Sequence, residues 1–181
     1  DKTVQKDQYD FINTKRGKKF GESVSLNFLY DESNIMIYKE GGTRHRNYIA
    51  YEIISTPGID LVKEIDLGLY SNYHIHAMEI IKTNGQRIPA DRNGSHGVFN
   101  GLEVGDVVYL DYEYNSASSG RFHKDFQSRF QFGGIYPTTL QKIRLFLPEN
   151  ETISYSVENG NIAPMITNNE GFKIYEWTQK D

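Results

Sequence analysis

Short runs in which apolar and polar residues alternate constrain the fold of this chain more than any other sequence feature. In the segment 97–115, Asp111 and Glu113 share one parity, and an apolar series occupies the other. The apolar series consists of Val108, Leu110, Tyr112 and Tyr114. Since successive side chains of a strand point to opposite faces, this period of two predicts a strand with one buried face and one polar face.

Several other runs are rich in β-branched and aromatic residues and are bounded by turn residues, which is typical of strands. They occupy residues 23–30, 34–39, 48–55, 73–83, 86–89, 140–147, 152–157 and 172–177. Within 23–30, one parity is apolar throughout and predicts a single buried face. That parity comprises Val24, Leu26, Phe28 and Tyr30. The Asn84-Gly85 pair predicts a tight hairpin, because both residues tolerate the positive φ of a type I′ turn.

Phenylalanines recur every fourth residue from position 122 to position 130, a spacing that suits a helix. The same residues and one further phenylalanine share one parity, which suits a strand. They are Phe122, Phe126, Phe130 and Phe132. We expect a strand here, because Gly120 and the Gly133-Gly134 pair flank an aromatic-rich segment.

Many short strands without alternating helices determine the predicted fold class. They predict an all-β protein, an antiparallel two-sheet β-sandwich of about ten strands. The 13 tyrosines and 10 phenylalanines agree with this class, and no segment has the pattern of a long amphipathic helix. We expect residues 1–22 to form an N-terminal extension or edge segment, anchored by Phe11, Ile12 and Phe20. Residues 23–181 then form the sandwich domain, truncated from a longer chain.

The absence of cysteine excludes the widest range of chemistry. Without cysteine, the chain has no disulfide, no thiolate metal site and no cysteine nucleophile. A formal net charge of -4 provides no attraction to nucleic acid or to an anionic membrane. No run of about 18 apolar residues is present that could span a bilayer, and no nucleotide-binding loop motif occurs. We therefore expect no cofactor, no nucleic-acid partner and no transmembrane segment in this chain.

A longer motif lies between the predicted hairpin and the strand that ends near Asn115. It follows the phrase F-x-x-L-x-x-G-D-x-V, at Phe99, Leu102, Gly105, Asp106 and Val108. The Asn84-Gly85 turn precedes this phrase, and Tyr175-x-Trp177 closes the chain. In this order of motifs the chain resembles an uncharacterised bacterial domain that precedes transglutaminase-like domains.

The resemblance implies an all-β module of exported, periplasmic or envelope-associated proteins, followed by a transglutaminase-like catalytic domain. The nucleophile of that catalytic domain is a cysteine, so its activity cannot be assigned to this chain. We therefore expect a non-catalytic module that packs against a neighbouring domain of the same chain or against a partner protein. Gly105-Asp106 indicates a turn whose carboxylate accepts backbone hydrogen bonds, rather than a catalytic acid.

Tyrosines and arginines are the candidate binding residues. Tyr70, Tyr73 and Tyr109 could contribute to a protein interface, or could stack on sugar rings if the module binds a glycan. Arg44 and Arg46 belong to a short basic loop after two glycines, for which a solvated hairpin tip is the simpler interpretation. A carbohydrate-binding module therefore remains an alternative to a protein-interaction module.

An enzyme is the alternative from a different class. His74 and His76 are two residues apart on a predicted strand, so both imidazoles could reach one metal ion. A third ligand would have to come from His45, His96 or His123. Asp111 and Glu113 could form an acid–base pair for glycoside hydrolysis, but cross-strand pairing with Lys or Arg is the simpler explanation.

Overall fold

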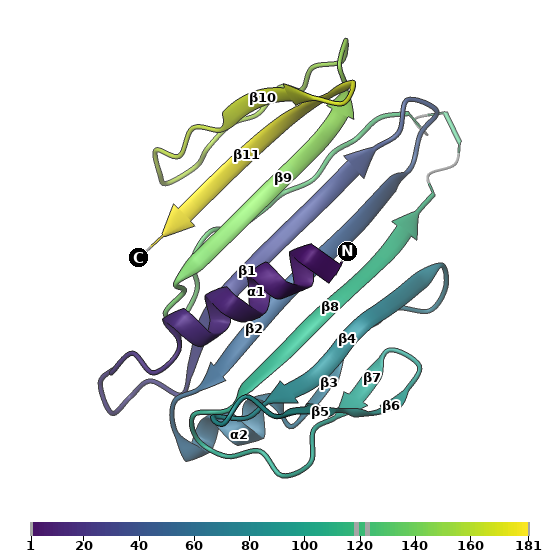
Figure 1. The fold of residues 1–181 in the computed structure, drawn as a ribbon. Helices are drawn as coiled ribbons and strands as arrows, with labels where there is room; N and C mark the ends of the chain where they lie inside the picture. The colour runs from purple at the N-terminus through teal and green to yellow at the C-terminus, as the bar shows by residue number, and fades with distance from the viewer. Residues whose placement is uncertain (1, 118–119, 122–123, 181) are drawn as a thin grey trace.

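The computed structural model describes residues 2–117, 120–121 and 124–180, which form a mostly β fold with two sheets and two helices (Figure 1). The helices are α1 (Lys2–Lys15) and α2 (Thr56–Val62). The strands are β1 (Leu26–Ile37), β2 (Thr43–Ile53), β3 (Glu64–Asp66), β4 (Tyr73–Ile81), β5 (Arg87–Pro89), β6 (Asp91–Asn93), β7 (His96–Val98), β8 (Val107–Ser116), β9 (Leu140–Pro148), β10 (Met165–Asn169) and β11 (Phe172–Lys180). The predicted β character is confirmed, whereas the two helices were not expected.

Eight strands form one large mixed sheet in the order β10-β11-β9-β1-β2-β8-β4-β5. The other three form a small sheet in the order β3-β7-β6. Strands β1 and β9 pair in parallel, so the prediction of a purely antiparallel architecture is wrong at this position. Alternation of side chains is the same in parallel and antiparallel strands, and therefore the sequence pattern does not reveal strand direction.

Strands β4 and β5 form the hairpin predicted at Asn84-Gly85. Gly85 N donates to Lys82 O, and Lys82 N donates to Gln86 O. Gly85 has a φ of 84°, whereas Asn84 is not in the positive-φ region. These contacts are typical of a type I turn followed by a glycine bulge. The hairpin is confirmed, but it is not closed by the expected type I′ turn.

Strand β1 is continuous where the sequence predicted two strands, at 23–30 and 34–39. Its register with β2 shifts between Phe28 and Tyr30, which marks a β-bulge at Leu29. Leu26 belongs to the core cluster on one face of the large sheet, and Tyr30 to the cluster on the other. The predicted single buried face of 23–30 is therefore wrong beyond Phe28, because the extra residue reverses the alternation.

Helix α1 lies across one face of the large sheet, which we call the helix face (Figure 1). Ile12 is fully buried against the core cluster of this face, and Phe11 packs edge-on against Tyr30. Residues 1–22 thus include an element that is packed on the sheet. The sequence did not reveal this helix because its buried stripe is narrow and includes the polar residue Gln8. Neither described helix is long and apolar enough to cross a membrane.

The opposite face of the large sheet carries two apolar clusters. Helix α2 and the small sheet cover the first, and a Cβ added at Gly97 of β7 would lie 2.2 Å from Met78 Sδ on β4. The second cluster lies on β9 and β11, where Phe126 and Phe132 pack against it. Segments 124–137 and 149–164 contain no strand, so the strands predicted over 122–132 and 152–157 are wrong for the described residues. Phe122 lies outside them.

Candidate functional site

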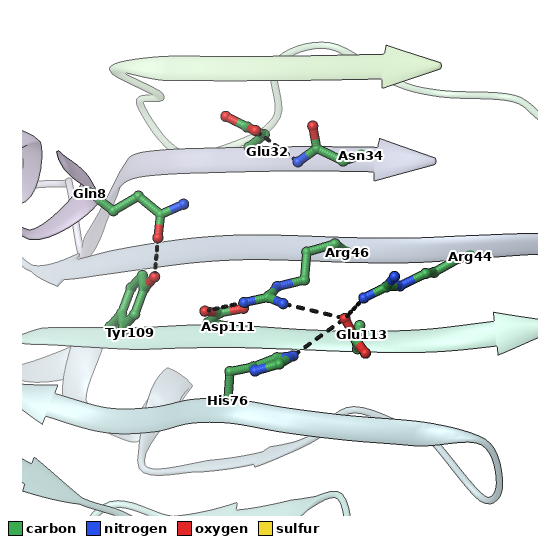
Figure 2. A network of polar contacts seen from close by, with 9 residues as sticks. All are labelled: Gln8, Glu32, Asn34, Arg44, Arg46, His76, Tyr109, Asp111 and Glu113. Carbon is green, nitrogen blue, oxygen red and sulfur yellow. Dashed lines mark hydrogen bonds and ion pairs between the residues drawn. The ribbon is translucent and has the colours of Figure 1, made fainter. Parts of the chain in front are cut away.

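The centre of a polar network on the helix face is the pair formed by Arg46 of β2 and Asp111 of β8 (Figure 2). Arg46 Nε lies 2.8 Å from Asp111 Oδ1, and Arg46 Nη2 lies 3.0 Å from Asp111 Oδ2. The side chains are 15% and 0% exposed, respectively. Although burial alone would lower it, the pKa of Arg46 is raised, because Asp111 accepts hydrogen bonds from the charged form. The pair is a bidentate ion pair that is shielded from water.

Glu113, two residues further along β8, joins three other side chains of this face. Its Oε2 lies 2.6 Å from Arg44 Nη2, 3.3 Å from Arg46 Nη1 and 3.4 Å from His76 Nε2. Burial opposes the shift, but the hydrogen bond and the charge of Arg44 lower the pKa of Glu113 below its ordinary value. The expected cross-strand pairing of Asp111 and Glu113 with arginine is confirmed.

The two arginines do not lie at a hairpin tip, as the sequence suggested. Strand β2 begins at Thr43, so Arg44 and Arg46 both lie within the strand and share its helix face. The turn before β2 contains Gly41 and Gly42, both with positive φ. The interpretation as a solvated basic loop is therefore wrong, because the strand extends five residues earlier than the predicted start at Tyr48.

His76 occupies an irregular position in β4, where the register with β8 shifts between Ile75 and Ala77. The rings of His74 and His76 lie 4.3 Å apart, so the two imidazoles are neighbours as predicted. His76 Nε2 is buried, and its contact with Glu113 Oε2 at 3.4 Å is too long for a good hydrogen bond. Within the part of the chain that the structure describes, no three His, Asp or Glu side chains are grouped to hold a metal ion. His123 lies outside that part.

The network continues towards the other edge of the large sheet. Arg144 of β9 pairs with Glu32 of β1 at 3.1 Å and also with Glu176 of β11. Asn34 Nδ2 donates to Glu32 Oε1 at 2.7 Å (Figure 2). Acidic and basic residues thus alternate from strand to strand in what we call the charge ladder. In strand order from β11 to β8, its members are Glu176, Arg144, Glu32, Arg46 and Asp111 with Glu113.

Sequence reasoning missed Glu32, Arg144 and Glu176. Residues 31–33 were expected to connect two strands, whereas they lie inside the continuous strand β1. A signal was present, because charged residues at alternate positions of a strand indicate a polar face. Pairing of opposite charges on adjacent strands stabilises a particular register, and like charges directly opposite each other would oppose it. The charge ladder therefore helps to specify which strands are neighbours.

The three predicted binding tyrosines do not form one exposed set. Tyr109 is 0% exposed, and its hydroxyl donates to Gln8 Oε1 of α1. Tyr70 is 95% exposed in the connection before β4, and Tyr73 borders a small cleft with His74. The expectation of a ring platform that includes Tyr109 is therefore wrong, because α1 covers that ring. Tyr70 and Tyr73 remain predictions as binding residues.

The chemistry of the charge ladder fits a structural role better than acid–base catalysis. A catalytic carboxyl group must come within hydrogen-bond distance of the substrate. Asp111 has no exposed side-chain surface, and both of its oxygens accept hydrogen bonds from Arg46. Glu113 accepts hydrogen bonds from two arginines. These two carboxylates are therefore held by cations rather than directed towards an open site.

A second candidate site is a groove of about 1500 Å³ on the opposite face. Its floor includes Leu145 of β9 and Trp177 of β11, and its walls come from the irregular segments 124–132 and 151–162. Arg129 pairs with Glu158 at 2.9 Å and connects the two walls. Tyr155 contacts Trp177 edge-on, with ring centroids 5.5 Å apart. The groove is thus an aromatic depression between two segments without regular structure.

The family DUF3857, a domain of unknown function with a solved structure, matches residues 82–181. This chain belongs to the DUF3857 family. None of the curated proteins matches it. The matched residues of this DUF3857 chain include β8, β9 and β11, and therefore the acidic residues Asp111, Glu113 and Glu176 of the charge ladder as well as most of the groove. Arg44 and Arg46, the partners of Asp111 and Glu113, lie before the match, whereas Arg144, the partner of Glu176, lies within it.

Similar solved structures have low sequence identity to this chain. A candidate protease from Parabacteroides distasonis superposes with a TM-score of 0.73 and 13% identity, over 86% of this chain and 35% of its own. An M1 zinc metallopeptidase from Deinococcus radiodurans gives a TM-score of 0.45 and 14% identity, over 87% of this chain and 39% of its own. The DUF3857 chain thus spans well under half of these proteins. The first similarity shows a common fold and assigns no activity.

Proposed function

We propose that this chain is a non-catalytic protein-interaction module that binds a neighbouring domain through the groove over β9 and β11. One observation carries the proposal. Exposed large apolar side chains gather around the groove, although single exposed apolar residues are usually scattered over a surface. They are Tyr38, Phe130, Tyr155 and Val157. Exposed apolar side chains above an apolar floor are typical of a surface that a partner covers.

The charge of the groove favours an apolar polypeptide as its occupant. Three basic and three acidic residues line it, so it attracts neither polyanions nor polycations. The basic residues are Lys39, Lys124 and Arg129, and the acidic ones are Asp125, Glu151 and Glu158. Binding would then depend on burial of apolar and aromatic surface, which contributes roughly 25 cal/mol per Å².

The resemblance noted in the sequence supplies a candidate for the neighbour. We infer that a transglutaminase-like domain follows this module in a bacterial protein of the envelope or the exported fraction. We also infer that the small sheet acts as the second layer of a two-sheet sandwich, supported by its contact with β4 at Gly97 and Met78. In this arrangement the module supplies a binding surface, and the neighbouring domain supplies any chemistry.

Hydrogen exchange tests the proposal. The complete polypeptide encoded by the gene is compared with the 181-residue chain, and amide exchange is followed in the groove segments 143–147 and 153–158. We expect slower exchange in both segments of the complete polypeptide, because a docked neighbour excludes water from them. Val157→Asp, which places a charge on the groove rim, should restore fast exchange. Ile135→Asp is the matched control, since Ile135 is exposed but does not line the groove.

Equal exchange in the two proteins would refute docking at the groove. The glycan alternative has a separate readout, because Trp177 is the single tryptophan and lies on the groove floor. A shift of Trp177 emission when soluble oligosaccharides are added to the 181-residue chain would favour a carbohydrate-binding module.

A further inference from the structure

The outer edge of β10 is the most open strand edge in the part of the chain that the structure describes. Strand β10 is the terminal strand of the large sheet, and it pairs only with β11 (Figure 1). All five of its residues are exposed, with Met165 at 58% and Ile166 at 52%. Its sequence, MITNN, contains no charge and no proline, and its register with β11 runs without a bulge. The unpaired main-chain groups of this edge are therefore free to accept another strand.

The other three sheet edges are protected by the devices that usually prevent strand pairing. Each consists of a strand of only three residues that carries charged side chains. Strand β5 has Arg87 and ends at Pro89, β3 has Glu64 and Asp66, and β6 has Asp91. Since these devices are used at three edges, their absence at β10 indicates a difference in role.

We propose that β10 pairs antiparallel with β10 of a second copy of this chain. An antiparallel pair of identical strands is related by a two-fold axis, so the donors and acceptors of one edge complement those of the other. The neutral sequence places no like charges opposite each other. Pairing of β10 with a different edge of the second copy is disfavoured by the short, charged strands there. The assembly therefore closes as a dimer instead of extending into a fibre.

The size of this contact determines how tightly the copies associate. Five paired residues bury less surface than the 1,200–2,000 Å², roughly, of a stable interface. A weak, concentration-dependent dimer is the consequence, with a dissociation constant between about 1 μM and about 1 mM. The inference is independent of the proposed function, because Met165 and Ile166 do not line the groove.

Sedimentation velocity over a range of concentrations tests the dimer. We expect the mass to rise from 20.9 kDa towards twice that value as the concentration increases. Ile166→Lys should keep the protein monomeric, because a charged side chain on an edge strand opposes its pairing with another strand. Ile135→Lys makes the same substitution at another exposed isoleucine and should leave the dimer intact.

Hydrogen exchange of the β10 amides gives a second, independent readout. Exchange should slow as the wild-type concentration rises, and it should not slow in Ile166→Lys. A wild-type protein that stays monomeric at about 1 mM would overturn the proposal, as would a dimer that survives Ile166→Lys with unchanged affinity. A dimer with unprotected β10 amides would also overturn it, because the copies would then associate elsewhere.

Discussion

Replacing Arg46 by alanine should destabilise this protein more than the same replacement of Arg44, which lies on the same face of β2. The change removes the guanidinium that binds both oxygens of Asp111, at 2.8 and 3.0 Å, and one contact to Glu113 at 3.3 Å. Asp111 stays in place with no exposed side-chain surface. It therefore loses its two charge-assisted hydrogen bonds without gaining full access to water.

The size of the effect follows from the burial of the pair. Removal of one partner of a buried ion pair costs about 3–5 kcal/mol. Because the Arg46 side chain is 15% exposed, water can partly enter the space that it leaves. We therefore expect the lower end of that range, about 3 kcal/mol in the free energy of unfolding. For a chain of this length, such a loss lowers the melting temperature by about 6–12 °C.

Urea unfolding followed by far-ultraviolet circular dichroism measures this free energy, with Arg44→Ala as the matched control. Arg44 lies two residues away on the same face, but its side chain is 46% exposed and it binds only Glu113. An exposed ion pair contributes less than about 1 kcal/mol. The double variant Arg46→Met/Asp111→Leu should regain most of the lost stability, because apolar residues can replace a buried ion pair at little cost.

Equal destabilisation by Arg46→Ala and Arg44→Ala would refute this reasoning, since burial of Asp111 would then have no measurable consequence. A double variant no more stable than Arg46→Ala would refute the second step, because the loss would then come from packing of the arginine stem rather than from the two hydrogen bonds between Arg46 and Asp111.

Three further predictions concern pH, packing and metal. The pKa of Glu113 is held below the ordinary value of 4.5, so the contribution of its carboxylate to stability is present above that pH and is lost as the pH falls. In urea titrations, the difference in unfolding free energy between wild type and Glu113→Gln should therefore shrink between about pH 6 and about pH 3. Gly58→Ala should lower the free energy of unfolding by about 1–3 kcal/mol, because the added Cβ would lie 2.2 Å from the Ser25 carbonyl oxygen. Gly21 has open space around it, so the free energy of unfolding of Gly21→Ala should stay within about 0.5 kcal/mol of the wild-type value. A chelator should leave the melting temperature unchanged, and a decrease that is absent in His76→Ala would instead reveal a bound metal.

Strand identity was largely predictable from local pattern, and the errors have identifiable causes. The parity of Asp111 and Glu113 was correct because β8 has no bulge within that stretch, so local alternation matches the faces of the sheet. The single buried face predicted for 23–30 was wrong after Leu29, because one extra residue at the bulge moves Tyr30 to the other face of the sheet. Helix α1 was missed because Ile12 is buried by the sheet beneath it, and its own sequence has little apolar periodicity.

The candidate site was predictable only in part. Arg44, Arg46 and His76 were identified as chemically interesting residues, but not as neighbours of Asp111 and Glu113. Their proximity depends on the pairing of β2 and β4 with β8, which are distant in sequence. The groove could not be anticipated, because it is formed by segments that pack on β9 and β11 without making a strand.

The sequence by itself determined that the chain is rich in strands, that it lacks cysteine chemistry, and that Asp111 and Glu113 share one face of β8. These properties depend on residue type and on the two-residue period of a strand, and both are local. The tertiary structure alone decided that β1 and β9 are parallel, that α1 covers Tyr109, and that opposite charges occupy alternate strands. Each of these depends on which distant segments pair, and that choice is made by the burial and loop closure of the whole chain.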